Sequence, residues 1–323
     1  MHRGRKKDMH DKITQIQNEV KKVIIGKDDV INKVLMAILA QGHVLLEDVP
    51  GTGKTTLATS FAKALGLDTK RVQFTSDTMP SDIIGFSVYD MQTGELQYKP
   101  GAIMTNLLLA DEINRTSSKT QSALLEAMEE KQVTVDGITR QLEEPFVVLA
   151  TQNPVGSAGT QMLPSAQLDR FLIKTSMGYP DRASQVEIMK GRHHSNPLDS
   201  VTAVADIPEL LSLINEVTNV HISDTIYDYV SDLVEKTRNH PYVQLGISPR
   251  GALALCRTAK ACAYLHKRDY VTSGDVLEVF GCIGAHRLVL SSKARLHELS
   301  AEAILKEIAA EVKKPDVKES KIR

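Results

Sequence analysis

Tryptophan is absent from this 323-residue sequence, and aromatic residues make up only 4% of it. An uninterrupted apolar run of about 20 residues, the length that crosses a bilayer, is also missing. The basic start, MHRGRKKDMH, is not followed by the apolar stretch that a secretory signal needs. We therefore expect no membrane association and no export, and little of the aromatic surface on which single-stranded nucleic acids stack.

The charge is close to balanced, with 39 basic and 40 acidic residues and a net charge of −1. Such a composition gives no global bias toward nucleic acid or anionic membranes. The three cysteines, Cys256, Cys262 and Cys282, are odd in number, lie in helical patterns and show no metal-ligand spacing. We expect buried thiols in a reducing compartment, and therefore a cytoplasmic location.

The long stretch over residues 12–180 alternates short apolar segments with helical patterns. Five segments are typical of buried strands: 43–47, 71–75, 106–110, 145–151 and 171–175. Helical spacing is found at 11–25, 29–41, 54–65 and 117–130. This alternation predicts an α/β domain with a largely parallel, five-stranded sheet between helices. Residues 1–11 are expected to form a solvated tail.

Two further stretches, 86–98 and 131–141, fit no strand–helix–strand unit. Each alternates around a turn, at Gln92-Thr93-Gly94 in the first and at Asp136-Gly137 in the second. Asp-Gly between alternating residues is a strong hairpin signal. Both stretches are therefore predicted to be β-hairpins inserted into the α/β domain, either as surface decoration or as elements that contact a partner.

After Tyr179-Pro180 the pattern becomes helical, and no strand signal is evident. Ser248-Pro249 is typical of a helix start, and Thr272 with Asp275 fits a capping box. We predict an all-helical second domain over residues 181–300. A polar tail or helix is expected over 301–323.

The segment EDVPGTGKTT, residues 47–56, follows a predicted strand and begins a predicted helix. In such a loop backbone N–H groups face phosphate oxygens, and Lys54 would reach the β- and γ-phosphates of a nucleotide. Thr55 would ligate Mg²⁺ through its hydroxyl. Asp48 replaces the usual first glycine. Because Asp tolerates unusual backbone angles and can bond nearby loop N–H groups, we interpret it as a turn residue.

The segment LLLADEINR, residues 107–115, is a predicted strand that ends in two carboxylates. A strand tip beside a phosphate loop is where an acid would complete a magnesium site, so Asp111 is expected to contact the ion through bound water. Glu112 would act as general base for an attacking water. Two acids can simply end a strand, but their pairing with the GKTT loop favours the functional interpretation.

Several other polar residues are weaker signals by themselves. Asn153, in ATQNP, lies at a strand tip and could orient the same water, although Asn-Pro is also a common turn. A lone arginine such as Arg170 is more often a salt-bridge partner. Arg250, in SPRG, places a cation in the first turn of a helix, where a phosphate would compensate it. His193-His194 is interpreted as part of a solvated loop rather than a metal site.

EDVPGTGKTT, LLLADEINR, ATQNP, LDRF and SPRG, in this order and spacing, resemble the motifs of AAA+ ATPases. Residues 101–137 are similar to the central block of the MoxR family almost throughout, and the resemblance covers about residues 12–300. In that family the phosphate loop commonly reads E-[DG]-x-P-G-x-G-K-T, so Asp48 is a family variant. The resemblance implies an ATPase that uses ATP and Mg²⁺, with an AAA+ core, two hairpin insertions and a helical lid domain.

The resemblance also implies roles for single residues. Asn153 matches sensor 1, Arg250 matches sensor 2, and Arg170 matches an arginine finger that acts on a neighbouring subunit's nucleotide. Arg115 is left as an ion-pair partner. The residues implied to be catalytic are Lys54, Glu112, Asn153, Arg170 and Arg250; those implied to bind nucleotide are Ile25, Gly26, Pro50, Gly51, Thr52, Gly53, Lys54, Thr55 and Thr56; those implied to hold the metal are Thr55 and Asp111.

The resemblance further implies a ring of identical subunits, a hexamer in the family. It implies chaperone-like remodelling or metal insertion on partners with von Willebrand factor A domains. This chain has no D-x-S-x-S motif, so such a domain would belong to another protein. The alternatives are a nucleic-acid motor, a transcription activator and a magnesium-chelatase-like motor subunit. Balanced charge, few aromatics and the lack of a DNA-binding module disfavour nucleic acid, and the lack of an N-K-x-D motif disfavours a GTPase.

Overall fold

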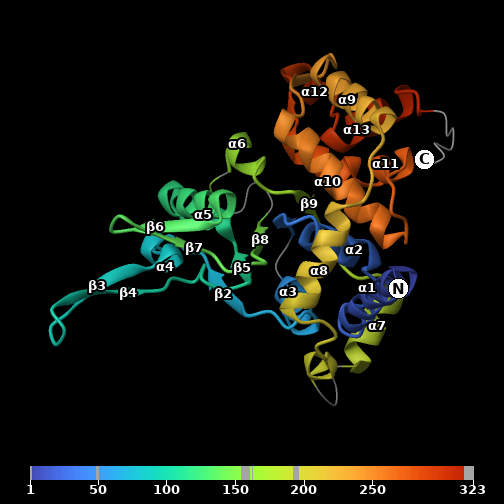
Figure 1. Cartoon of the computed structure of the whole chain (residues 1–323). Helices are drawn as coiled ribbons and strands as arrows, with labels where there is room; N and C mark the ends of the chain where they lie inside the picture. The colour runs from blue at the N-terminus through green and yellow to red at the C-terminus, as the bar shows by residue number, and fades with distance from the viewer. Residues whose placement is uncertain (1, 49–50, 154–160, 162, 192–195, 316–323) are drawn as a thin grey trace. The chain divides into compact units, whose positions relative to one another are not determined.

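Residues 2–48, 51–153, 161, 163–191 and 196–315 are described by the computed structural model. They form two compact units, Met1–Ile214 and Asn215–Arg323, drawn in Figure 1 from blue to yellow and from orange to red. The sequence predicted the boundary at residue 180, but in the structure it lies between residues 214 and 215. The reason is that the chain after helix α7 (Arg182–Gly191) returns to the first unit, where Val204 N–H donates to the carbonyl of Ala64 at 3.0 Å.

The first unit is built on a five-stranded parallel sheet with the strand order β2-β5-β8-β1-β9. Its strands are β1 (Val44–Glu47), β2 (Thr69–Gln73), β5 (Leu107–Asp111), β8 (Val147–Gln152) and β9 (Ile173–Thr175). All five predicted strands are therefore present in one sheet. β5 and β8 are buried along their whole length, as expected for inner strands covered on both faces.

Helices cover both faces of this sheet. The helices of this unit are α1 (His2–Lys21), α2 (Asp28–Leu39), α3 (Lys54–Ala64), α4 (Pro80–Ile84), α5 (Ser118–Glu130), α6 (Ser165–Leu168) and α7, with the short 3₁₀ turns η1 (Ile113–Arg115) and η2 (Pro197–Ser200). On one face, Leu108 and Val148 share a core with Leu124 of α5. Successive strand residues point to opposite faces, so Leu107 and Leu109 point the other way, and α3 packs against β5.

Both predicted hairpins are present as antiparallel pairs: β3 (Phe86–Asp90) with β4 (Glu95–Lys99), and β6 (Gln132–Val135) with β7 (Ile138–Gln141). The β3–β4 hairpin extends away from the sheet (Figure 1) and exposes several large apolar side chains. The two hairpins meet where the Arg140 guanidinium lies 3.9 Å from the centre of the Tyr98 ring, a cation–π contact.

The second unit is mainly helical. Its elements are the end of α8 (Ile207–Thr218), α9 (Asp224–Arg238), β10 (Val243–Leu245), α10 (Pro249–Leu265), α11 (Ser273–Gly284), η3 (Ala285–Arg287), β11 (Val289–Leu290), α12 (Ser292–Leu296) and α13 (Ala301–Glu311). Thr272 and Asp275 form the predicted capping box at the start of α11. Ser248 caps α10 by accepting from the N–H of Gly251.

The structure differs from the predicted organisation in three details. Helix α1 begins at His2, so residues before 12 are not a separate tail: an apolar pattern marks only the packed part of a helix, not its polar start. Strand β10 pairs with β11 where no strand was expected, because segments of two or three residues are too short to show a period. A helix was one of the two forms expected past residue 300, and α13 is that helix; because it buries Ile304, Leu305 and Ile308, it belongs to the folded second unit, which was expected to end at 300.

The sequence also predicted no membrane-spanning segment and no disulfide-bonded cysteines. Among the described residues, no helix has the length and apolarity to cross a bilayer. All three cysteines lie in the described part of the chain, and none forms a disulfide; Cys262 is buried and the other two are half-buried.

Candidate functional site

The residues expected to carry chemistry lie at one edge of the parallel sheet. Strands β5, β8 and β1 are neighbours, and their carboxyl ends share the edge at which ligands bind in open α/β sheets. Asp111 ends β5, Gln152 ends β8, and Asp48 follows β1. The strand order thus brings together three motifs that are far apart in the sequence.

The loop after β1 has the backbone of a phosphate cradle. Gly51 and Gly53 have φ angles of +84° and +91°, in the left-handed region that glycine adopts at little cost. Gly53 directly precedes α3, whose first-turn N–H groups can bind an anion. Among the described residues outside its immediate chain neighbours, a Cβ atom placed on Gly51 would meet no atom within 4 Å, which leaves room for a ligand on that side. Pro50 lies outside the described residues.

Lys54 is buried at the start of α3, with 8% of its surface exposed. Its Nζ donates to the carbonyl oxygen of Asp48 at 3.1 Å. A buried ammonium group is costly unless acceptors or an opposite charge surround it. A phosphate in the loop would supply that charge. Thr55, the next residue and the predicted metal ligand, is half-buried in the same turn.

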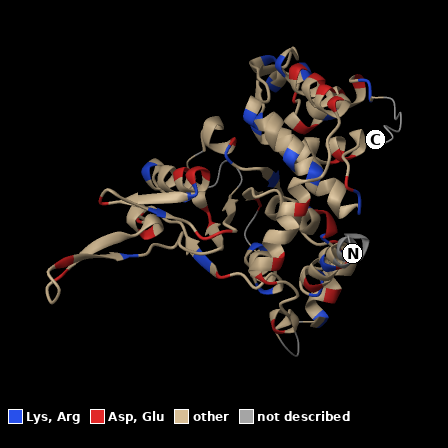
Figure 2. Cartoon of the chain, in the orientation of Figure 1, with Lys and Arg blue, Asp and Glu red and all other residues tan. Residues whose placement is uncertain are grey.

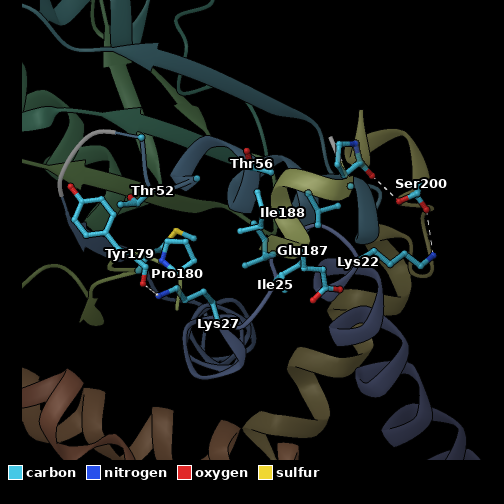
Figure 3. Close-up of a pocket in the computed structure, with 17 residues that line it drawn as sticks. Lys22, Ile25, Lys27, Thr52, Thr56, Tyr179, Pro180, Glu187, Ile188 and Ser200 are labelled. Atoms are coloured by element: carbon cyan, nitrogen blue, oxygen red, sulfur yellow. Dashed lines mark hydrogen bonds between the residues drawn. The ribbon is translucent and has the colours of Figure 1, made fainter. Parts of the chain in front are cut away.

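A cavity of about 410 Å³ opens beside this loop. Its lining joins loop residues with residues from four other segments (Figure 3): Gly51, Thr52, Gly53 and Thr56; Ile25; Met177, Tyr179 and Pro180; Ile188; and Pro197 and Ser200. The apolar part of this wall suits the flat, largely apolar faces of a nucleotide base. A volume of this size is within the range of ligand pockets.

The two residues predicted to line a base pocket are placed differently. Ile25 lines the cavity. Gly26 instead lies against α7, where a Cβ atom at Gly26 would come within 2.1 Å of Ser184 Oγ. With a φ of +70°, Gly26 allows the chain to turn beside α7, so it supports the wall and does not form it. Tyr179 also lies on this wall and is 75% exposed. The sequence analysis places it at a domain boundary and does not predict it as a cavity residue.

Asp111 and Glu112 both form hydrogen bonds with one residue of the neighbouring strand β8. Thr151 on β8 is fully buried, and its hydroxyl donates to Asp111 Oδ1 at 2.6 Å. The same hydroxyl accepts from the N–H of Glu112 at 2.8 Å. Asp111 Oδ2 accepts from Arg71 at 2.7 Å. One hydroxyl thus bonds the carboxylate of Asp111 and the backbone of Glu112, a role that the sequence analysis missed; a threonine within an otherwise apolar strand is the signal that could have found it.

Glu112 turns away from the strand with a φ of +59°, a conformation that is uncommon outside glycine and concentrated at functional sites. Its carboxylate accepts from Arg115 at 2.7 Å, from Gln73 at 2.9 Å and from Asn153 Nδ2 at 3.1 Å. Burial favours the neutral acid, but the bonds from Arg115 and Asn153 outweigh it, so the pKa of Glu112 lies below its usual value. Glu112 is therefore a carboxylate at neutral pH, as a general base must be.

Asn153 is brought to this cluster as predicted. While its Nδ2 donates to Glu112, its Oδ1 is buried and has no hydrogen-bond partner among the described residues. A buried acceptor of this kind is costly to leave unsatisfied. A water molecule beside Glu112 could donate one hydrogen to the Asn153 oxygen and the other to the carboxylate. The pair therefore fits the task of orienting a water.

Comparison with known proteins agrees with this geometry. Residues 43–173 match the model of the ATPase family associated with various cellular activities (AAA), and residues 235–308 match the AAA lid domain. The chain is 38% identical to chaperone MoxR1 of Mycobacterium tuberculosis, over 93% of this chain and 81% of that protein. It is 49% identical to protein YeaC of Bacillus subtilis, over 98% of both chains. A crystal structure from Cytophaga hutchinsonii, 39% identical, superposes with a TM-score of 0.90 over 97% of this chain and 98% of that one.

The chain belongs to the MoxR family of AAA+ ATPases. Within this family fold, the structure does not bring Arg170 into the cluster of Glu112 and Asn153. Arg170 pairs instead with Glu129 of α5, Nε to Oε2 at 3.2 Å. Arg250 lies in the second unit, in the first turn of α10. The roles of Arg170 as arginine finger and of Arg250 as sensor 2 stay predictions.

A second cluster in this MoxR-family chain lies in its second unit. The side chains of Cys262, His266 and Asp275 have possible ligand atoms within 4.8 Å of one another. Both oxygens of Asp275, however, accept from the Arg268 guanidinium. Burial raises the pKa of the Cys262 thiol, which works against the thiolate that a metal needs. The cluster is better explained as part of the α10–α11 packing. His193-His194 lies outside the described residues.

Proposed function

We propose that this MoxR-family chain binds ATP with Mg²⁺ in the cavity beside α3 and hydrolyses it. The observation that carries the proposal is the Glu112–Asn153 pair at the sheet edge beside the buried lysine of the phosphate loop. The two parts are directly linked, because the N–H of Asp48 donates to the carbonyl of Gln152 at 3.3 Å. Asp48 begins the loop that leads to Lys54, and Asn153 directly follows Gln152.

Each residue then has a distinct task. Lys54 and the N–H groups of α3 hold the β- and γ-phosphates. Glu112 accepts a hydrogen bond from the attacking water, and the Oδ1 of Asn153 accepts the second one, so that an oxygen lone pair faces the γ-phosphorus. Asn153 also holds the carboxylate of Glu112 in place through its Nδ2.

The donor set fits Mg²⁺, which prefers hard oxygen ligands and keeps several of its waters. The Thr55 hydroxyl and the Asp111 carboxylate are the residues that would hold it. When bound, Mg²⁺ neutralises charge on the phosphate oxygens. One oxygen of Asp111 accepts a hydrogen bond from Thr151, and the other accepts one from Arg71. Each oxygen keeps a lone pair, so Asp111 can still take part in holding Mg²⁺.

Ring assembly is proposed because Arg170 lies outside its own chain's cluster. An arginine supplied in trans accelerates hydrolysis by roughly 10³–10⁵-fold in related nucleotide hydrolases. The Arg170–Glu129 pair is partly exposed, with 30% and 38% of the side chains accessible. Such pairs contribute about 0–1 kcal/mol, so Arg170 could leave Glu129 at little cost. A closed ring, a hexamer as in the family, would place it at a neighbour's nucleotide.

A protein partner in the cytoplasm is proposed as the target of this ATPase, with remodelling or metal insertion as the outcome. The name of the relative chaperone MoxR1 supports a chaperone-like role. Lysine and arginine are interspersed with acidic residues along both units (Figure 2), so the charge pattern does not favour nucleic acid. A separate protein with a von Willebrand factor A domain is the proposed partner class.

The hydrolysis proposal is tested by ATPase assays with Mg²⁺ on the wild type, Glu112→Gln and Lys54→Ala. We expect Glu112→Gln to bind ATP but not to turn it over, because the amide cannot accept the proton. Lys54→Ala should lose binding as well. A wild type that fails to bind ATP at millimolar concentration, or an active Glu112→Gln variant, would overturn the proposal.

The partner proposal is tested separately by loading tagged Glu112→Gln with ATP and recovering bound proteins. We expect a von Willebrand A-domain protein that is lost with Lys54→Ala. Recovery of DNA or of polymerase subunits would instead place the chain among nucleic-acid motors or activators. Recovery of a chelatase subunit would favour the magnesium-chelatase-like alternative, and both outcomes would leave the hydrolysis proposal intact.

A further inference from the structure

We propose that Asp48 is a positioning residue, which holds the wall of the cavity formed by Met177, Tyr179 and Pro180 against the phosphate loop. The inference rests on the proposed ATP binding. It concerns a position where phosphate loops usually carry glycine. The inference replaces the interpretation of Asp48 as a tolerated turn residue. It implies that a glycine at position 48 would impair the nucleotide site.

The carboxylate of Asp48 is buried, with 5% of the residue exposed. It accepts hydrogen bonds from the backbone N–H of Met177 and from the N–H of Gly178, the latter at 3.1 and 3.2 Å from its two oxygens. Bonds from N–H groups to a carboxylate are stronger than those to a neutral acceptor. The acid therefore joins the loop after β1 to the chain after β9.

The backbone of Asp48 makes two more links. Its N–H donates to the carbonyl of Gln152 at the end of β8, and its carbonyl accepts from Nζ of Lys54. One residue therefore fixes the spacing between three parts of the site: the strand tip that leads to Asn153, the phosphate-binding lysine, and the wall that begins at Met177.

This bond holds the wall where it begins, at the backbone of Met177 and Gly178. Met177 is buried, lines the cavity, and places its Cε 3.8 Å from where a Cβ of Gly53 would lie. Lys27 holds the next part of the wall by donating to the carbonyl of Tyr179 at 2.8 Å (Figure 3). Without the Asp48 carboxylate, the N–H of the buried Met177 would lose its acceptor, at a cost in free energy.

A purely structural role and a positioning role make different predictions for two ligands. Tripolyphosphate occupies only the phosphate loop, whereas ATP also contacts the wall. If Asp48 positions the wall, its loss weakens binding of ATP and leaves binding of tripolyphosphate nearly unchanged. If Asp48 only supports the loop, both ligands are weakened alike.

The experiment measures binding of Mg·ATP by calorimetry, and of inorganic tripolyphosphate by its competition with ATP, for the full chain. The variants are Asp48→Gly, which restores the usual glycine, and Asp48→Asn, which keeps the shape. Asp136→Gly in the exposed turn of the β6–β7 hairpin is the matched control. Circular dichroism melting of each variant shows whether it is folded, and Asp48→Asn carries the test if Asp48→Gly is not.

We expect Asp48→Gly to raise the dissociation constant of ATP roughly tenfold, the effect of losing a charge-assisted hydrogen bond, and Asp48→Asn to raise it less. The dissociation constant of tripolyphosphate should change by less than about twofold in both variants. Unchanged or tighter ATP binding by both variants would overturn the inference, and so would equal losses for the two ligands. A wild type that binds no ATP refutes the proposed function instead.

Discussion

Arg115 donates a hydrogen bond to Glu112 across 2.7 Å, within a single turn of η1. The arginine expected to be an ion-pair partner is confirmed as one, and its partner is the proposed general base. The pair has a chemical consequence, because a guanidinium beside a carboxylate stabilises the ionised form. Arg115 thus keeps the carboxylate of the proposed base ionised.

The first prediction follows from that pair. In Arg115→Gln the pKa of Glu112 should rise, since the bond and charge that lower it are weakened while burial remains. A base with a raised pKa becomes protonated at higher pH, so the acid limb of the rate–pH profile should move to higher pH. Arg140→Gln, on the β6–β7 hairpin, is the control and should keep the wild-type limb. An acid limb that stays in place or moves down would contradict the assignment of Glu112 as base.

Thr151 should act on catalysis through Asp111 and Glu112, not through nucleotide affinity. Thr151→Val keeps the shape but removes the hydroxyl that donates to the Asp111 carboxylate and accepts from the Glu112 backbone N–H. Because bonds to charged groups are worth about 1.5–3 kcal/mol, we expect kcat to fall roughly tenfold to a hundredfold. ATP affinity should hold, and Thr151→Ser should recover much of the rate. A selective loss of affinity in Thr151→Val would show that its role is different.

Subunit mixing tests whether Arg170 acts in trans. Arg170→Ala lacks the finger but has an intact Glu112, and Glu112→Gln lacks the base but has an intact finger. Each variant alone should be nearly inactive, with Arg170→Ala reduced by up to roughly 10³–10⁵-fold. An equimolar mixture should regain activity at sites that combine both functional residues. If mixing restores nothing while both variants assemble, Arg170 is not supplied by a neighbour.

Asp275 should be a stability determinant of the second unit. It is buried, bonds the Arg268 guanidinium, and closes the capping box of α11. Asp275→Ala should lower the free energy of unfolding by about 1.5–3 kcal/mol, the range for a hydrogen bond to a charged group. Because the chain has no tryptophan, urea unfolding is best followed by circular dichroism. Asp232→Ala, exposed on α9, should change stability little; equal effects of the two substitutions would contradict the prediction.

The elements that the sequence predicted well are those with local causes. Asp136 and Gly137 adopt φ angles of +51° and +76°, the conformation that a tight hairpin turn demands and that Asp-Gly tolerates. The short strands are visible because burial on both faces requires an unbroken apolar run, as in β5. Such signals depend on a few consecutive residues, so they can be read without the fold.

The elements that could not be predicted depend on distant partners. The start of α1 is polar and therefore carries no apolar period, and the position of the unit boundary depends on contacts such as that of Val204 with Ala64. The pairing of β10 with β11 also depends on a distant partner, because segments of two or three residues become strands only where a partner edge is available. Gly26 was expected in the cavity wall but lies against Ser184, a contact between segments far apart in the chain.

By itself the sequence determined the chemical groups of this protein and their order: a phosphate loop with Lys54, two acids after an apolar strand, and an asparagine at another strand tip. The tertiary structure alone decided how these groups work together. The strand order places Thr151 between Asp111 and Glu112, and the turn after β9 brings the N–H groups of Met177 and Gly178 to Asp48. A local pattern reports what a segment prefers, whereas hydrogen bonds between distant segments exist only after the sheet has assembled.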